Sequence, residues 1–181
     1  MSEPRSQAPA WSFPVAVADV PETGRRVDIA ADGAVREAIA KVAGLAALPR
    51  LEAGFDLTRQ GSDGLHLVGR VRATVVQDCV VTLEPIESGI DEAVDLLFLP
   101  QAPRAADAAA PRTIDADESP EALHDGVLDL GAVATEFLLL GIDPYPRKAG
   151  AVFEAPPAGD PASHPFAALA ALRKGDRSEP G

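Results

Sequence analysis

The amino-acid sequence predicts an α+β fold, an antiparallel twisted sheet or partly open barrel of about five to six strands packed by two helices. Two observations favour this class. Several stretches alternate apolar and polar residues with the period of two that is typical of half-buried strands, and two others repeat apolar residues at helical spacing. The 17 prolines and 15 glycines among 181 residues cluster outside these stretches, so we expect a compact core with sizeable irregular regions.

A strand, a helix and a second strand are predicted in the first third of the chain. Residues 11–17 alternate apolar with small or polar side chains, and Pro14 argues for an edge position. Asp32 can cap a helix that ends near Gly44. The apolar positions of that helix are Val35, Ala38, Ile39 and Val42. Alternation returns over residues 51–57, and the glycine-containing stretch 60–64 supplies a turn.

The most regular alternation begins at Leu65. Its apolar face is predicted to hold Leu65, Leu67, Gly69, Val71, Ala73, Val75, Gln77, Cys79, Val81 and Leu83. Arg70 and Arg72 fall on the opposite, outward face. Because the run is far longer than a usual strand of about 5–6 residues, we expect a bend or bulge at Gln77 and Asp78, where the apolar face is interrupted.

Cys79, the only cysteine, is predicted to be a buried structural residue. On an apolar face cysteine usually acts as a small apolar side chain, and a reactive thiol is the alternative. A single cysteine excludes an internal disulfide and any multi-cysteine metal site. Residues 84–89 are then predicted to form a turn, and residues 90–98 a returning strand.

Residues 1–146 are predicted to form a single domain, with a mobile acidic loop at 100–125 that is rich in alanine, proline and aspartate. Residues 147–181 are predicted to be a flexible tail rich in proline and alanine. In the loop, Asp115, Asp117 and Glu118 could bind a divalent cation, but such clusters are usually solvated. We therefore expect no metal and no cofactor.

Two helices are predicted beyond the loop. The first ends at Gly141 and should cover the sheet as part of the core. Its apolar face consists of Leu130, Val133, Ala134, Phe137, Leu138 and Leu140. The second is a short tail helix at 163–175 with Phe166, Leu169 and Leu172 at spacings of three. Alone it is marginal, so it should dock on its own sheet or in a partner's groove.

The net charge of −12 and the pI near 4.6 bear on possible partners. Phosphate backbones repel an acidic chain, whereas a basic protein matches it; plain solubility is the alternative meaning of the charge. The N-terminus has no secretory signal, and no stretch is long and apolar enough to span a membrane. We expect a cytoplasmic protein without membrane contact.

No catalytic motif is found in the sequence. Nucleophilic catalysis needs a base beside the nucleophile, and no pattern brings His66, His124 or His164 to Cys79 or to a serine. Neither a glycine-rich phosphate loop nor a histidine pair with zinc spacing occurs. The sequence therefore predicts a protein that is not an enzyme.

Three blocks of sequence, at residues 68–85, 128–140 and 164–174, together resemble the YceD family of large ribosomal RNA subunit accumulation proteins. The resemblance implies a structural role for the motif residues Gln77, Cys79, Thr82, Glu84 and Pro85. Many family members carry a Cys-x-x-Cys pair in the first block. The match here is Cys79-Val-Val-Thr82, so no metal or redox function is carried over.

The resemblance implies a non-enzymatic role in the synthesis, processing or stability of large-subunit ribosomal RNA. The negative net charge further predicts that the direct partner is a basic ribosomal protein or a large-subunit assembly or processing factor. The acidic loop and the tail helix would be the docking elements, and contact with RNA would be indirect or weak. The alternative is direct RNA binding through Arg70 and Arg72. Aromatic stacking residues, common on single-strand RNA platforms, are missing from their face.

Overall fold

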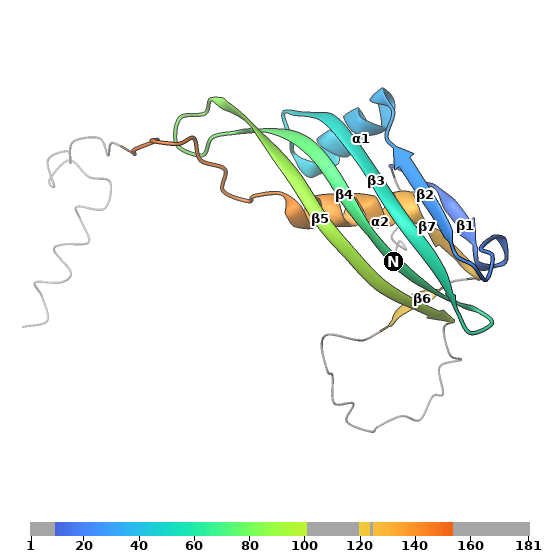
Figure 1. Ribbon diagram of the computed structural model, residues 1–181. Coiled ribbons are helices and arrows are strands. Elements are labelled where there is room, and N and C mark those ends of the chain that lie inside the picture. The colour runs from blue at the N-terminus through green and yellow to red at the C-terminus, as the bar shows by residue number, and fades with distance from the viewer. Residues whose placement is uncertain (1–9, 101–119, 124, 154–181) are drawn as a thin grey trace, which may run out of the picture. The chain divides into compact units, whose positions relative to one another are not determined.

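The computed structural model describes residues 10–100, 120–123 and 125–153 (Figure 1). By internal contacts the chain divides into residues 1–148 and residues 149–181. In the second unit, the described residues 149–153 contain a turn but no helix or strand. The following paragraphs concern the first unit.

The described residues of the first unit form a five-stranded sheet, a two-stranded sheet and two α-helices. In chain order the elements are β1 (Pro14–Ala16), the 3-10 helix η1 (Val17–Asp19), β2 (Arg25–Ala30), α1 (Gly33–Ala43), β3 (Ala47–Gln60), β4 (Gly64–Asp78), β5 (Pro85–Pro100), β6 (Glu121–Leu123), β7 (Val127–Asp129) and α2 (Leu130–Gly141). The larger sheet has the order β2-β3-β4-β5-β6, and β1 pairs with β7. Only the β5–β6 pair is parallel. The sheet is open, and the predicted α+β class is confirmed.

The core lies between one face of the larger sheet and the two helices (Figure 1). Alternate residues of β3 and β4 are buried on this face, as predicted for residues 51–57 and for residues 65–75. Phe55 is fully buried and lies opposite Gly69 in the strand pairing. A Cβ at Gly69 would come within 2.6 Å of the Phe55 ring, so the glycine makes room for the aromatic side chain. Burying a side chain of this size stabilises the fold by about 1.5–3 kcal/mol.

The two helices begin and end largely where the sequence predicts. The Asp32 carboxylate accepts the Val35 N–H and caps α1, which ends at Gly44 with φ of 66°. In this left-handed conformation a side chain would be strained, which explains the glycine. Val42 and Leu140, predicted inward, are 77% and 71% exposed. Both lie outside the arc that packs on the sheet, at the last turn of their helix.

Three short strands are missed by the sequence prediction. β2 has only two inward apolar residues, Val27 and Ile29, so its alternation is too brief to stand out. β6 lies inside the acidic loop predicted at 100–125, and β5 extends to Pro100, so these two parts of the predicted loop belong to strands; residues 101–119 lie outside the described residues. β6 and β7 pair with strands far away in the sequence, and such pairing leaves no local signal. Of the early strand predicted at 11–17, only β1 forms, at the edge position that Pro14 indicated.

The end of the long alternating run is also corrected. β4 stops at Asp78, and its register with β5 is unbroken, so of the bend or bulge predicted at Gln77 and Asp78 the bulge is wrong. The irregularity lies instead in β3, between Ala47 and Arg50. The turn occupies residues 79–84, not 84–89, because β5 begins at Pro85. Leu83, predicted inward, is 77% exposed, since the chain reverses there and the alternation of a strand no longer applies.

Candidate interaction surfaces

Two groups of residues singled out by the sequence lie in different parts of the first unit. One is the open face of the sheet, which carries Arg70 and Arg72. The other is the turn between β4 and β5, which carries the motif residues. The remaining candidates lie outside the described residues: Asp115, Asp117, Glu118, Phe166, Leu169 and Leu172, with the predicted helix at 163–175.

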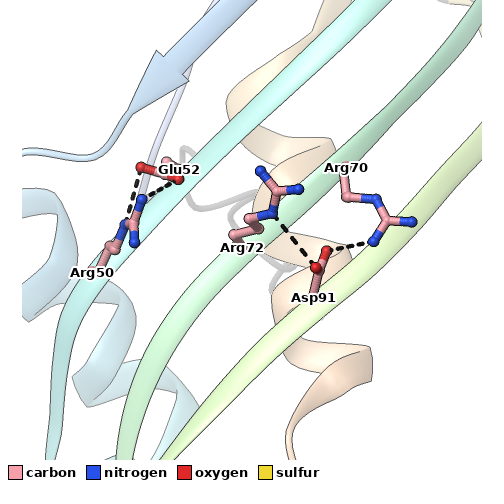
Figure 2. Close-up of polar contacts among 5 residues, drawn as sticks. All are labelled: Arg50, Glu52, Arg70, Arg72 and Asp91. Atoms are coloured by element: carbon pink, nitrogen blue, oxygen red, sulfur yellow. Dashed lines mark hydrogen bonds and ion pairs between the residues drawn. The ribbon is translucent and has the colours of Figure 1, made fainter.

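On the open face, charged side chains of opposite sign meet across neighbouring strands. Glu52 of β3, Arg72 of β4 and Asp91 of β5 are direct partners in the strand register. Figure 2 shows Asp91 between the two arginines of β4: Arg70 Nη1 lies 2.9 Å from Oδ1, and Arg72 Nε lies 3.5 Å from Oδ2. Arg50 binds both oxygens of Glu52. Burial raises the pKa of Asp91, but the hydrogen bond and charge of Arg70, with the charge of Arg72, outweigh it and hold the pKa below its ordinary value.

The same face is hollowed beside these residues. An open hollow of about 560 Å³ is lined in part by Gly54, where a Cβ would come within 2.5 Å of Asp28 Oδ1. The charged lining residues are Arg26, Arg70, Arg72, Asp28, Glu52 and Asp56. Arg26 contacts both Asp28 and Asp56, at 3.1 and 2.9 Å. Three arginines therefore face three carboxylates, and the hollow has no excess of positive charge with which to attract a phosphate.

The turn at 79–84 is organised around the Cys79 sulfur. Cys79 is fully buried, as predicted, and its Sγ accepts the N–H groups of Val81, Thr82 and Lys148, each at 3.4 Å. The hydrogen bond from the Lys148 backbone, followed by those from the Thr82 side chain and backbone, lowers the pKa of Cys79 to about 6. Hydrogen bonds that favour the thiolate explain this direction.

A segment distant in sequence closes over this turn. This segment is residues 143–148, which follow α2. Gln77 Nε2 donates to the Asp143 carbonyl at 2.9 Å, and the Val80 N–H donates to the Pro146 carbonyl at 2.9 Å. Lys148 Nζ forms an ion pair with Glu84 at 2.7 Å. These contacts join the motif residues to a segment more than 60 residues away in the sequence. Sequence reasoning identified the motif but missed its partner segment, because nothing in either stretch indicates the other.

His66 is the histidine that the structure describes, and its ion-pair contact is with the neighbouring strand β5, not with the Cys79 turn. His66 contacts Asp95 Oδ1 at 2.7 Å, and no contact joins it to Cys79. Within the described ranges, no three histidine, cysteine, aspartate or glutamate side chains are placed to hold a metal ion. The described helices also include none with the length and apolar character that crossing a membrane would require.

In its described residues the chain is an open α+β sheet with helices on one face, and its motif residues join the turn between β4 and β5 to the segment after α2. Its family is shown by comparison with known proteins. The family model for the large ribosomal RNA subunit accumulation protein YceD matches residues 67–173, which is more than half of the chain. The chain therefore belongs to that family. The resemblance of the three blocks is thereby confirmed. No curated protein and no solved structure matches the chain. Family membership supports a role in the accumulation of large-subunit ribosomal RNA.

Proposed function

We propose that this protein is a non-enzymatic, cytoplasmic factor that supports large-subunit ribosomal RNA as an acidic adaptor, binding a basic ribosomal protein or a large-subunit assembly or processing factor. The observation that carries the proposal is the pairing of the open-face arginines. Arg26, Arg50, Arg70 and Arg72 each contact a carboxylate of the same face. A phosphate would have to compete with those carboxylates on a chain whose net charge is −12.

Electrostatics favours a basic protein over RNA as the direct partner. Proteins gain most of their affinity for nucleic acid by placing lysine and arginine on phosphates and releasing counterions. On this face the arginines are already neutralised, so few counterions would be released. A lysine- or arginine-rich protein surface is instead attracted by the net charge of the chain.

The experiment compares the ratio of large- to small-subunit ribosomal RNA in a strain lacking the protein, with and without a complementing copy. We expect a selective drop in the large RNA that the copy restores. Tagged protein should then retain a basic protein after ribonuclease treatment and lose it as salt is raised. An unchanged RNA ratio would contradict the role, and a partner that is released by ribonuclease would contradict the adaptor.

Direct RNA binding through Arg70 and Arg72 is the second candidate. It is favoured by the uneven composition of the cluster in Figure 2, where three arginines meet two carboxylates and Arg72 reaches Asp91 only at 3.5 Å. Replacing both arginines with glutamate should abolish RNA crosslinks if this candidate is correct. For an adaptor, the same variant should keep both its protein partner and its ability to restore the RNA ratio.

A further inference from the structure

Within the part of the chain that the structure describes, β5 has an open edge over most of its length. The strand spans Pro85–Pro100 and pairs with β4 on one side from Pro85 to Phe98. On the other side, β6 pairs only with Phe98, Leu99 and Pro100. Among the described residues, 85–97 therefore have a strand partner on one side only. Figure 1 shows β5 at the margin of the sheet, with β6 at one end.

The pairing pattern shows which backbone groups point out of this edge. The Cys79 N–H donates to the Glu84 carbonyl at 2.8 Å, so this pair is of the hydrogen-bonded kind. In an antiparallel ladder such pairs alternate with pairs whose N–H and C=O groups point away from each other. Since the register runs unbroken to Leu65 and Phe98, the outward groups belong to alternate residues. They are Glu87, Gly89, Asp91, Ala93, Asp95 and Leu97.

Most devices that close a sheet edge are absent from β5. Its prolines stand only at the two ends, and the register with β4 shows no bulge. What remains is charge of a single sign: Glu87, Asp91, Glu92 and Asp95, with no lysine or arginine in the strand. Such an edge rejects strands of like charge and stays open to those of opposite charge.

The acidic residues of β5 therefore select the kind of partner. A second copy would bring four more carboxylates against these four, and phosphates would be repelled in the same way. No ion pair within the described residues involves Glu87 or Glu92. A lysine or arginine on an added strand could pair with either carboxylate.

We propose that an extended, lysine- or arginine-rich segment of a protein partner adds to the sheet as a strand beside residues 85–97 of β5. Backbone hydrogen bonds to the outward groups would supply pairing, and the carboxylates would set charge specificity. The inference rests on the proposed adaptor function and gives it a surface and a partner chemistry.

The direct test uses a synthetic peptide in which lysine alternates with threonine, and the same peptide with every backbone nitrogen methylated. Both carry the same charge, but only the first can donate backbone hydrogen bonds. We expect the first to slow hydrogen exchange at the outward amides of Gly89 and Ala93 by at least about tenfold, with smaller changes at Ile90 and Val94, which already donate to β4. Equal binding of the two peptides, or protection elsewhere, would overturn the proposal.

Gly89 allows a matched pair of variants. A Cβ at this position meets no atom within 4 Å, so Gly89→Ala should leave the edge intact. Gly89→Pro removes one outward N–H but no donor to β4. Strands tolerate proline at such edge positions, where the N–H group points away from the neighbouring strand. We expect the proline variant to bind the peptide about five- to tenfold more weakly than the alanine variant, the equivalent of about one hydrogen bond. Equal affinities, with both variants folded by circular dichroism, would count against strand addition.

Charge is tested separately at Glu87. Glu87→Lys should weaken peptide binding and reduce its salt dependence, because a cation would then oppose the lysines of the peptide. Glu22→Lys changes the net charge equally but lies before β2, at the opposite side of the sheet order. Equal loss in the two variants would assign the attraction to net charge alone and overturn the proposed edge.

The proposed binding edge and the proposed ribosomal function can be contradicted independently of each other. If the RNA ratio drops without the protein and the Gly89→Pro variant restores it as fully as Gly89→Ala, the adaptor role stands and the edge proposal fails. If the peptide protects β5 but the RNA ratio never changes, the edge stands and the ribosomal role fails. A dimer in sedimentation that Gly89→Pro abolishes would show that a second copy occupies the edge and would overturn the basic partner.

Discussion

One face of the five-stranded sheet is covered by α1 and α2 and carries fully buried apolar side chains such as Phe55, Leu57 and Leu67. The other face of the same strands is open and carries ion pairs such as Arg70 with Asp91. Contacts on the covered face are shielded from water, whereas those on the open face compete with it. The free energy of unfolding should therefore depend mostly on the covered face, and substitutions on the open face should alter binding more than stability.

The largest expected difference between the faces is at Phe55. Phe55→Ala should lower the free energy of unfolding by about 3–5 kcal/mol, because the ring is fully buried against Gly69 and leaves a cavity. The matched control is Asp56→Ala, one residue along β3 on the open face, which loses an exposed contact with Arg26 and should cost at most about 1 kcal/mol. Urea unfolding measures both. Similar costs for the two variants would refute this division of the sheet.

Asp129 should have the next largest effect, because it joins α2 to the N-terminal segment. Its carboxylate accepts the N–H groups of Gly131 and Ala132 at the start of α2, together with the Ser12 hydroxyl and the Phe13 N–H. Asp129→Ala should cost about 1–3 kcal/mol of unfolding free energy, and Asp129→Asn, which keeps an acceptor, should cost less.

The pKa of Asp129 gives the same contact a pH dependence. Burial raises this pKa, but hydrogen bonds from Ser12 and Phe13, with those from Ala132 and Gly131, outweigh it and lower the pKa below 3.8. A lowered carboxyl pKa adds stability that is present above the unfolded value and lost as pH falls through the folded value. Acid unfolding of the wild type should therefore show a loss near and below pH 3.8 that the Asp129→Asn variant lacks. Superimposable acid profiles would contradict this assignment.

A second effect, with the same direction in pH, is expected at Cys79. Its pKa falls from an ordinary 9.0 to about 6 when the protein folds, so between these values only the unfolded chain binds the proton. The free energy of unfolding should rise as pH is raised from about 6 to 9, and the gain should be lost as pH falls through about 6. Cys79→Ser should flatten this rise in chemical unfolding experiments. A wild type as flat as the serine variant would show that the thiol remains protonated.

The sequence predicts best the elements that form the covered face of the sheet. The alternation at residues 51–57 and 65–75 and the caps at Asp32 and Gly44 are local signals, and the structure confirms them. The corrections come where distant segments meet: β6 beside β5, β7 beside β1, and residues 143–148 over the Cys79 turn. The pairing of Arg70 and Arg72 with Asp91 is also non-local. Sequence spacing placed both arginines on one face but could not show that a carboxylate of the next strand neutralises them.

The smallest stability effect, and the sharpest test of the open face, is expected at Asp91. Asp91→Asn should change the free energy of unfolding by no more than about 1 kcal/mol, because its two ion pairs are exposed. It should nevertheless increase affinity for single-stranded RNA in low salt, since Arg70 and Arg72 would lose the carboxylate that neutralises them. Asp95→Asn is the control, because this substitution removes the same charge from β5 while Asp95 contacts His66 and not the two arginines.

Fluorescence anisotropy with a labelled RNA would distinguish the two candidate functions. If the open face is neutralised as described, the wild type and the Asp95→Asn variant bind weakly, and the Asp91→Asn variant binds more tightly in a way that disappears when Arg70 and Arg72 are also replaced. If the wild type already binds as tightly as the Asp91→Asn variant and depends on both arginines, Asp91 only orients them. RNA would then be the direct ligand of this face, and the adaptor would lose its main support.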